Sequence, residues 1–406
     1  MVDANRLTES WALVSAHGDQ VPLRFYGRLF VAHPELRDLF PISMAAQRDR
    51  LVRALGLVVS QAAQLDTIVP FLHELGREHR RFAATPEHYA AIGEALLDTI
   101  ADFLGDLWTP ELAGDWVQAY RLVGRVMIEA AEAAAHTPAW WDAEVVAHEA
   151  RTFDIAVLTI RPEAPFSYRA GQSMAVETAL RPRLWRYFSP ANAPRADGTI
   201  DLHVRRVPGG SVSSALVGQV GVGDRLRLGA AIGRDLTLGP GAGPGEGRDL
   251  LLIAGGTGLA PLKALVDQVA TDGGPGRPVR LFVGARTVRE LYDIDHLYSL
   301  ADRHPWLTVI AAVSEADHHP YADGMVADIA LLRSPDPLDH EIYVCGSKEM
   351  VDGTRARLHA AGCPPERVHH ESFVGLTDGL GKPGGIDGIS GIEGIDGGAA
   401  HLESER

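Results

Sequence analysis

The chain has 406 residues, of which 46% are hydrophobic and 22% charged, and its formal net charge at pH 7 is -15. At roughly 100–200 residues per domain this length predicts several domains, and the acidic surface disfavours nucleic acid and anionic membranes as partners. The only cysteines, Cys345 and Cys363, exclude a disulfide framework and any cluster or zinc site that needs three or four thiolates.

No apolar run approaches the ~20 residues of a membrane span. The first ten residues, MVDANRLTES, lack the basic and apolar regions of a signal peptide. We therefore expect a cytoplasmic protein that works on small molecules, with no nucleic acid, no membrane and no obligatory protein partner.

Residues 1–136 carry apolar positions at helical spacing and form the first expected domain, which is all-α. Thr85-Pro86-Glu87 and Thr109-Pro110-Glu111 each place a capping residue before a proline at the first helical position. Over 145–238 the segments FDIAVLTI and IDLHVRRV alternate in β-branched residues between turn signals, which predicts an antiparallel β-barrel or sandwich.

The composition of GPGAGPGEG at 239–247 is that of a flexible linker. Over 248–374 the apolar strands LLLIA, VRLFVGA and EIYVCG alternate with helical stretches, which is typical of a Rossmann-like parallel α/β domain. The glycine-rich tail at 375–406 is expected to be disordered.

In LLLIAGGTGLAPL a buried strand runs into a glycine turn and then a helix, an arrangement that suits a dinucleotide pyrophosphate. The residues concerned are Gly255, Gly256, Thr257, Gly258 and Pro261. Taken alone, the same turn fits any α/β protein. Cys345 and Gly346 end a later strand, where ligands of open parallel sheets bind, although Cys345 equally fits a small buried hydrophobe.

The stretch RLWRYFSPANAP predicts a short strand with Arg186 and Phe188 on one face and Tyr187 on the other, followed by Ser189. Further on, VPGGSVSSAL supplies Gly210 and Ser213 near a helix start, where a diphosphate can bind. Each stretch alone is as typical of an ordinary strand or turn. In the helical third, His73, His79 and His88 lie close together; an axial haem ligand is a helix-borne histidine of this kind, but most helical histidines are not ligands.

The reductase motifs together resemble the ferredoxin-reductase superfamily. They occur in that family's order: an Arg-x-Tyr-Ser-like strand, a glycine–serine segment, a Gly-Gly-x-Gly-x-x-Pro turn and Cys-Gly. The resemblance implies an FAD barrel at 145–238 and an NAD(P) domain at 248–374. Phe373 resembles the aromatic residue that lies against the flavin ring, while Phe188 stands where the family usually has tyrosine.

The N-terminal third resembles the globin domain of the flavohemoglobins in the order LRFYGRLFVAHPELRDLF, QRDRLVRAL, REHRRF and PEHYAAIGE. This resemblance implies haem b with His79 as the proximal iron ligand and Tyr89 as its hydrogen-bonding neighbour. On the distal side it implies that Tyr26 donates to dioxygen, that Phe40 wedges the haem, and that Gln47 and Leu51 face the same pocket. Plain core packing is the alternative for Tyr26 and Phe40.

One family feature departs from this pattern. The carboxylate expected beside the proximal histidine falls on Ala131, with Glu132 next to it. Because one residue turns a helix by about 100°, either the helix is locally shifted or the carboxylate is absent. Arg286, which ends RLFVGAR without an acidic neighbour, leaves NADH and NADPH both open as the reductant.

The family function that the resemblance implies is a nitric oxide dioxygenase, in which NAD(P)H reduces FAD and FAD reduces haem, so that NO and O2 become nitrate. The alternatives are another haem and flavin redox enzyme, or an oxygen-storing or oxygen-sensing globin whose reductase keeps the iron ferrous.

Overall fold

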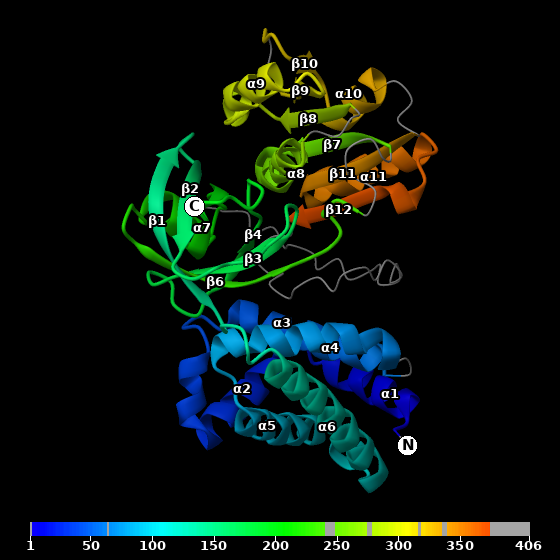
Figure 1. Cartoon of the computed structure of the whole chain (residues 1–406). Helices are drawn as coiled ribbons and strands as arrows, with labels where there is room; N and C mark the ends of the chain where they lie inside the picture. Colours follow the sequence, from blue (N-terminus) through cyan, green and yellow to red (C-terminus); the bar gives the residue numbers. More distant parts are fainter. Residues whose placement is uncertain are drawn as a thin grey trace, which may run out of the picture.

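The computed structural model of the chain describes residues 2–62, 65–239, 248–273, 278–315, 318–334 and 339–373, without the side chains of 65–67, 372 and 373. The predictions for the tail at 375–406 and for nearly all of the 239–247 linker therefore concern residues outside this description. The fold predicted from the sequence is confirmed: a helical domain, an antiparallel barrel and a parallel α/β domain follow one another along the chain (Figure 1).

The N-terminal domain is built from α-helices linked by short 3-10 turns. Thr85 and Thr109 cap α5 and α6 as the sequence predicts, and a proline follows each. Helix α4 crosses α6 closely at Gly76, where a Cβ would lie only 2.2 Å from the carbonyl oxygen of Met127. Its elements are α1 (Ala4–Ser15), α2 (Gln20–Ala32), η1 (Pro34–Leu39), α3 (Ala45–Ser60), α4 (Leu65–His79), η2 (Arg80–Phe82), α5 (Pro86–Leu104), η3 (Gly105–Leu107) and α6 (Pro110–Ala133).

The second domain is a six-stranded antiparallel sheet in the order β4-β3-β6-β1-β2-β5. A single bridge between Pro190 and Leu202 brings the end of β4 to β5, so the sheet nearly closes into a barrel. Buried apolar residues such as Leu158, Met174 and Val204 fill its interior. The elements are β1 (Trp141–Ala150), β2 (Ile155–Pro162), β3 (Ser173–Thr178), β4 (Arg186–Phe188), β5 (Ile200–Arg205), α7 (Ser211–Gly218) and β6 (Arg225–Ile232).

The third domain is a parallel sheet in the order β10-β9-β8-β7-β11-β12. Strands β7 and β11 are neighbours, so their carboxyl ends meet at one edge of the sheet. The elements are β7 (Asp249–Gly255), η4 (Gly256–Gly258), α8 (Leu259–Thr271), β8 (Val279–Ala285), η5 (Val288–Glu290), α9 (Ile294–Arg303), β9 (Leu307–Val313), β10 (Ala322–Asp323), α10 (Val326–Arg333), β11 (His340–Ser347), α11 (Lys348–Ala360), η7 (Pro365–Arg367) and β12 (Val368–Phe373).

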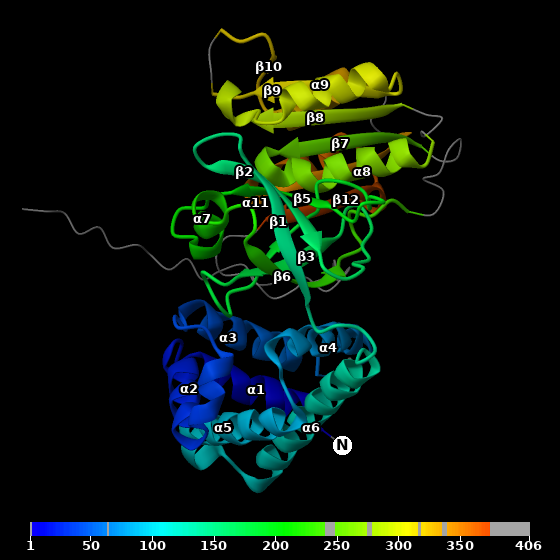
Figure 2. The ribbon, with the colours of Figure 1, turned by 60° about the vertical axis from the view of Figure 1, so that its left-hand side comes forward.

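The barrel lies between the other two domains, as two views of the chain show (Figures 1 and 2). Helices α3 and α4 form the layer of the helical domain nearest the barrel in both views, and α8 is the helix of the α/β domain that lies close to it. None of the helices described is both long and apolar enough to cross a membrane. In this arrangement α4 lies at the boundary between the helical domain and the barrel, and α8 lies at the boundary between the barrel and the α/β domain.

Candidate functional site

The distal residues predicted from the sequence come together in the helical domain. Tyr26 of α2 is only 6% exposed, and its hydroxyl accepts a hydrogen bond from Gln47 Nε2 of α3 at 3.3 Å. The ring of Phe40 meets that of Tyr26 edge-on, with 5.4 Å between centroids. Leu51 is half-buried and packs against the same apolar cluster.

This arrangement leaves Tyr26 able to act as a hydrogen-bond donor. Because Gln47 supplies the proton of their shared hydrogen bond, the phenolic proton of Tyr26 is free for another acceptor. Burial raises the pKa of Tyr26 to about 12, although the Gln47 hydrogen bond works in the opposite direction. The phenol is therefore protonated at every pH at which the protein would work.

On the proximal side, His79 is the last residue of α4, and its ring is held in one tautomer. Its Nδ1 lies 2.7 Å from the backbone oxygen of Leu75. A carbonyl oxygen only accepts, so Nδ1 carries the proton and Nε2 keeps a lone pair. Burial lowers the pKa of His79, which keeps the ring neutral at pH 7. A neutral imidazole whose other nitrogen is tied to a backbone carbonyl is the usual form of an iron-binding histidine.

Tyr89 lies beside His79, with 6.4 Å between ring centroids, but its hydroxyl lacks the expected carboxylate. Within the described part of the chain, Tyr89 Oη is buried and has no hydrogen-bond partner, and burial raises its pKa to about 12. Ala131 is half-buried near the end of α6, and Glu132 beside it is exposed. The helix is therefore not shifted to bring Glu132 inward, and the network on this side has no carboxylate from α6.

Three arginines converge where the helical domain meets the barrel: Arg81 is paired with Glu78, while Arg50 favours an anionic occupant. Burial lowers the pKa of Arg50 on α3, and the charges of Arg186 and Arg81 lower it further. Arg50 Nε is buried with no hydrogen-bond partner among the residues described. A buried guanidinium with an unpaired N–H suits a carboxylate or a phosphate, which are the anionic groups of haem and FAD. With the neutral His79 and the orphaned Tyr89 hydroxyl, the residues present fit a haem.

The predicted flavin residues lie along β4 and just beyond it. Arg186 is half-buried, and burial lowers its pKa. Phe188 packs against the barrel core, and Ser189 Oγ is buried without a partner within the described ranges. Tyr187 points the other way, and its hydroxyl bonds to Glu78 and Arg81 of the helical domain. Arg186 Nη1 donates to the backbone oxygen of Trp185 at 2.8 Å, so among the residues described the buried Ser189 hydroxyl is the unpaired group that fits a cofactor on this side of the strand.

The glycine–serine segment forms the start of α7, with Gly210 as the capping residue. Ser213 Oγ accepts a hydrogen bond from the backbone N–H of Val207 at 3.2 Å, which ties this side chain to the preceding loop. The segment therefore presents mainly backbone groups at the helix start, the chemistry that binds a diphosphate. Phe373 ends β12, and its side chain lies outside the described part of the structure.

The nucleotide turn packs directly against the end of β11. Gly256 has a positive φ of 54°, and a Cβ on Gly258 would lie 2.3 Å from the backbone oxygen of Cys345. A Cβ on Gly346 would in turn approach the Cα of Gly255 at 3.3 Å. The structure thus brings the turn and the Cys345-Gly346 pair together, with Thr257 inside the turn and Pro261 in the first turn of α8. The side chain of Cys345 is fully buried.

A charged cluster that we did not predict lies beside this turn. Glu290 Oε1 accepts from Arg286 at 2.9 Å and from Arg205 at 2.6 Å. Arg205 also binds Asp154 Oδ2 at 3.0 Å, and its Nη1 lies 3.4 Å from where a Cβ on Gly256 would be. The four-residue spacing of Arg286 and Glu290 was a readable signal. Arg205 belongs to the barrel, so only the fold reveals its part.

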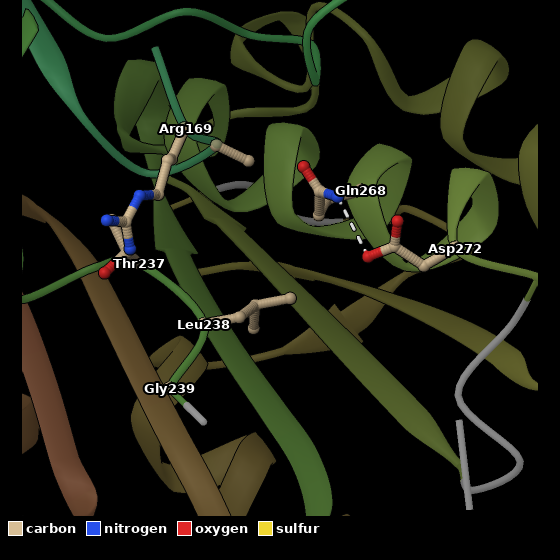
Figure 3. Close-up of a pocket in the computed structure, with 7 residues that line it drawn as sticks. Arg169, Thr237, Leu238, Gly239, Gln268 and Asp272 are labelled. Carbon is tan, nitrogen blue, oxygen red and sulfur yellow. Dashed lines mark hydrogen bonds between the residues drawn. The ribbon is translucent and has the colours of Figure 1, made fainter. Parts of the chain in front are cut away.

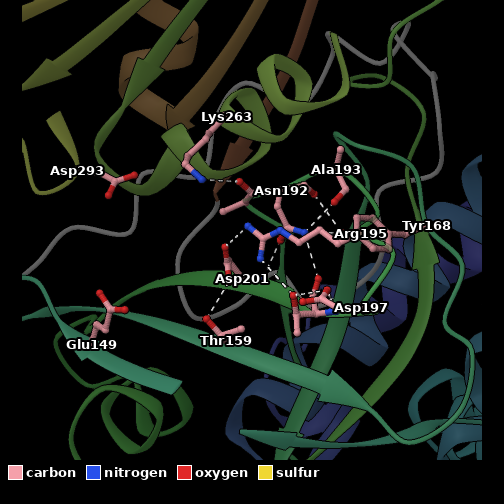
Figure 4. A network of polar contacts seen from close by, with 12 residues as sticks. Glu149, Thr159, Tyr168, Asn192, Ala193, Arg195, Asp197, Asp201, Lys263 and Asp293 are labelled. Atoms are coloured by element: carbon pink, nitrogen blue, oxygen red, sulfur yellow. Dashed lines mark hydrogen bonds and ion pairs between the residues drawn. The ribbon is translucent and has the colours of Figure 1, made fainter. Parts of the chain in front are cut away.

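The barrel and the α/β domain meet through a polar network around Lys263 of α8 (Figure 4). Lys263 is 4% exposed and donates to the backbone oxygen of Ala191 at 3.2 Å. Nearby, Asp201 binds Arg195 at 2.6 Å and accepts from Thr159 at 2.8 Å. Burial acts to raise the pKa of Asp201, but the Arg195 hydrogen bond and charge hold it below its usual value. Lys263 on the α/β side and Asp201 on the barrel side are both largely shielded from water, so their polar contacts are satisfied in only one relative orientation of the two domains.

A cleft of about 280 Å³ lies at the far end of α8 from the nucleotide turn (Figure 3). Its walls include Arg169, Leu238 and Gln268, and Gln268 Nε2 donates to Asp272 Oδ2 at 2.9 Å. Gln268 lies in the last turn of α8 and Asp272 is its C-cap, whereas the glycine turn precedes its first turn, so this cleft is separate from the predicted dinucleotide site.

Three family models match the chain in the order of its domains. The model described as globin matches residues 23–127, the oxidoreductase FAD-binding domain matches 141–235, and the oxidoreductase NAD-binding domain matches 252–356. Flavohemoproteins match over the whole of this arrangement. That of Bacillus subtilis is 24% identical over 89% of this chain and 94% of its own length, and that of Bordetella parapertussis is 28% identical over 89% and 95%.

The chain belongs to the flavohemoglobin family. The fold agrees: a flavohemoglobin structure from Malassezia yamatoensis superposes with a TM-score of 0.71, at 21% identity, over 91% of this chain and 98% of that one. The reductase half of this flavohemoglobin is also 30% identical to the reductase component of a naphthalene 1,2-dioxygenase system from Pseudomonas putida, over 65% of this chain and 77% of the relative. The cofactors of this flavohemoglobin are haem, FAD and a nicotinamide dinucleotide.

We expect Tyr26→Phe to lower the affinity of the ferrous protein for dioxygen by about tenfold or more, the effect of losing ~1.5–3 kcal/mol from one charge-assisted hydrogen bond. Rapid-mixing measurements of dioxygen release check this. Tyr298→Phe, at a 38% exposed site on α9, is the matched control and should change nothing. Equal release rates for wild type and Tyr26→Phe would remove Tyr26 from the distal site.

We expect Glu290→Gln to shift the flavohemoglobin towards NADPH. Burial acts to raise the pKa of Glu290, but hydrogen bonds from Arg286 and Arg205 hold it below its usual value, so the carboxylate neutralises both cations. Its removal should raise the NADPH to NADH ratio of kcat/KM about three- to tenfold. Asp295→Asn, at an exposed carboxylate on α9, serves as the control. A ratio that stays constant or falls would place the nucleotide phosphate elsewhere.

Proposed function

We propose that this flavohemoglobin is an NAD(P)H-dependent nitric oxide dioxygenase that converts NO and O2 to nitrate. The proposal depends on the Tyr26–Gln47 pair, which leaves a protonated phenol available as a donor among buried apolar side chains. A donor in such surroundings stabilises negative charge that develops on oxygen. The flavohemoprotein relatives support the same reaction class.

The reaction balances with one electron for each nitrate. NO, O2 and one electron contain the atoms and charge of nitrate, so one hydride from NAD(P)H serves two turnovers and a proton is released. When bound, FAD supplies the division of a hydride into single electrons, and haem iron supplies the site at which dioxygen is activated. The polypeptide has to shield the nicotinamide, FAD and haem from water and hold them in the order in which electrons pass between them.

Different residues of the chain then have different roles in this reaction. His79 offers Nε2 to the iron because its Nδ1 proton is committed to Leu75. Tyr26 would donate a hydrogen bond to dioxygen, and half-buried Leu51 would narrow the path by which dioxygen and NO enter the site. In the reductase half, the turn at Gly255–Gly258 receives the pyrophosphate of the nucleotide, while Arg186 and Ser189 hold the flavin.

A second candidate is a haem and flavin redox enzyme with a different product. The unpartnered Tyr89 hydroxyl favours it, because a proximal histidine without a carboxylate network donates less electron density to the iron. Weaker donation makes oxygen activation weaker. An oxygen-storing or oxygen-sensing role remains the third interpretation, and the donor left on Tyr26 argues for slow oxygen release instead.

Steady-state consumption of NO in air with NADH or NADPH tests the proposal. We expect two nitrates for each NAD(P)H oxidised, and no consumption when either dioxygen or the reductant is omitted. NAD(P)H oxidation that proceeds equally without NO, with no nitrate formed, would overturn the proposal and favour the second candidate.

A further inference from the structure

Three side chains from two domains form a closed cluster at the boundary between the globin domain and the FAD barrel. We call Glu78, Arg81 and Tyr187 the junction. The Tyr187 hydroxyl donates to Glu78 Oε1 and accepts from Arg81 Nη2 at 3.2 Å. Arg81 Nη1 donates to the same Glu78 oxygen at 3.0 Å. Every member therefore bonds to the other two.

The junction is shielded from water. The side chains of Glu78 and Arg81 are 10% and 6% exposed. The Arg81 guanidinium lies over the rings of Trp185 and Tyr187, at 5.4 Å and 5.6 Å from their centroids. Its Nη1 also lies 3.4 Å from where a Cβ on Gly229 of β6 would be. A globin arginine is thus seated on the surface of the barrel, where separation of the domains would strip a buried charge of its partners.

Along the chain, the junction residues adjoin residues of both predicted cofactor sites. Glu78 directly precedes His79, and Arg81 follows two residues later in η2. On the barrel side, Tyr187 is the middle residue of β4, flanked by Arg186 and Phe188. Fixing the Tyr187 hydroxyl therefore fixes the haem-bearing end of α4 against the flavin-bearing strand.

We propose that the junction aligns the globin and FAD domains for electron transfer, with Tyr187 as the positioning residue. Domains joined by a short connection move relative to one another unless their interface prevents it. Electron transfer between cofactors falls steeply with distance, so such movement slows it. This inference rests on the electron path from FAD to haem in the proposed function. It adds that the Tyr187 hydroxyl keeps the two domains aligned for that path.

Tyr187→Phe removes the hydroxyl but keeps the ring and leaves the Glu78–Arg81 ion pair intact. The test is anaerobic rapid mixing of the holoenzyme with excess NADH, which follows flavin bleaching and haem reduction separately. We expect flavin bleaching at the wild-type rate and haem reduction slowed at least about tenfold, as for a small misplacement of reacting groups. Added sucrose should slow haem reduction in the variant but not in the wild type, because domain motion then limits the rate.

The matched control is Asp38→Asn. Asp38 and Arg183 form another ion pair between the same two domains at 3.9 Å, with side chains 88% and 41% exposed. An exposed pair contributes little, so this variant should reduce its haem at the wild-type rate. The haem and flavin contents and the haem midpoint potential should be the same in all three proteins.

Several results would overturn the inference. One is wild-type haem reduction in Tyr187→Phe, and another is equal slowing in Asp38→Asn. A shifted haem potential that accounts for the slowing would assign Tyr187 to the iron through Glu78 instead of to alignment. If Tyr187→Phe loses its cofactors, Glu78→Gln is measured in the same way, and wild-type haem reduction in that variant would equally contradict the inference. The assay contains neither NO nor dioxygen, so its outcome is independent of nitrate formation.

Discussion

The hydrogen bond between His79 and the carbonyl of Leu75 is the interaction on which the rest of the site depends. It commits the Nδ1 proton inside the helix and leaves a lone pair on Nε2 of a ring whose pKa is lowered by burial. The position of His79 at the end of α4 then matters as much as its chemistry. Because the helix ends there, the next residues turn out of the globin core and reach the barrel.

The two domain boundaries are held by different physical means. Between globin and barrel, one tyrosine hydroxyl closes a small cluster around a single buried ion pair. Between barrel and α/β domain, the buried Lys263 donates to a backbone oxygen beside a wider polar network. Both arrangements supply orientation, because buried charges and hydrogen bonds are satisfied in only one register.

Much of this fold was predictable because its signals are local. The caps at Thr85 and Thr109, the strand alternation of the barrel and the glycine turn each occupy a few adjacent residues. The absence of a proximal carboxylate was harder to predict. Ala131 and Glu132 differ by one step of helix rotation, so only the packed helix shows which of them faces inward.

Contacts between distant segments had no sequence signal. Tyr187 was assigned to the flavin strand, and that strand is where it lies, but its bonds to Glu78 and Arg81 span more than a hundred residues. Arg205 reaches Glu290 from another domain in the same way. Spacing rules describe neighbours on one helix or strand, whereas these pairs exist only after the domains have docked.

The proposed electron path runs from the flavin to an iron held by His79 of the same chain. The most direct measurement is the visible absorption spectrum of His79→Ala, recorded anaerobically before and after NADH under carbon monoxide. We expect a yellow protein whose flavin still bleaches but which shows no ferrous haem–carbon monoxide band. A red protein that forms this band as the wild type does would contradict it.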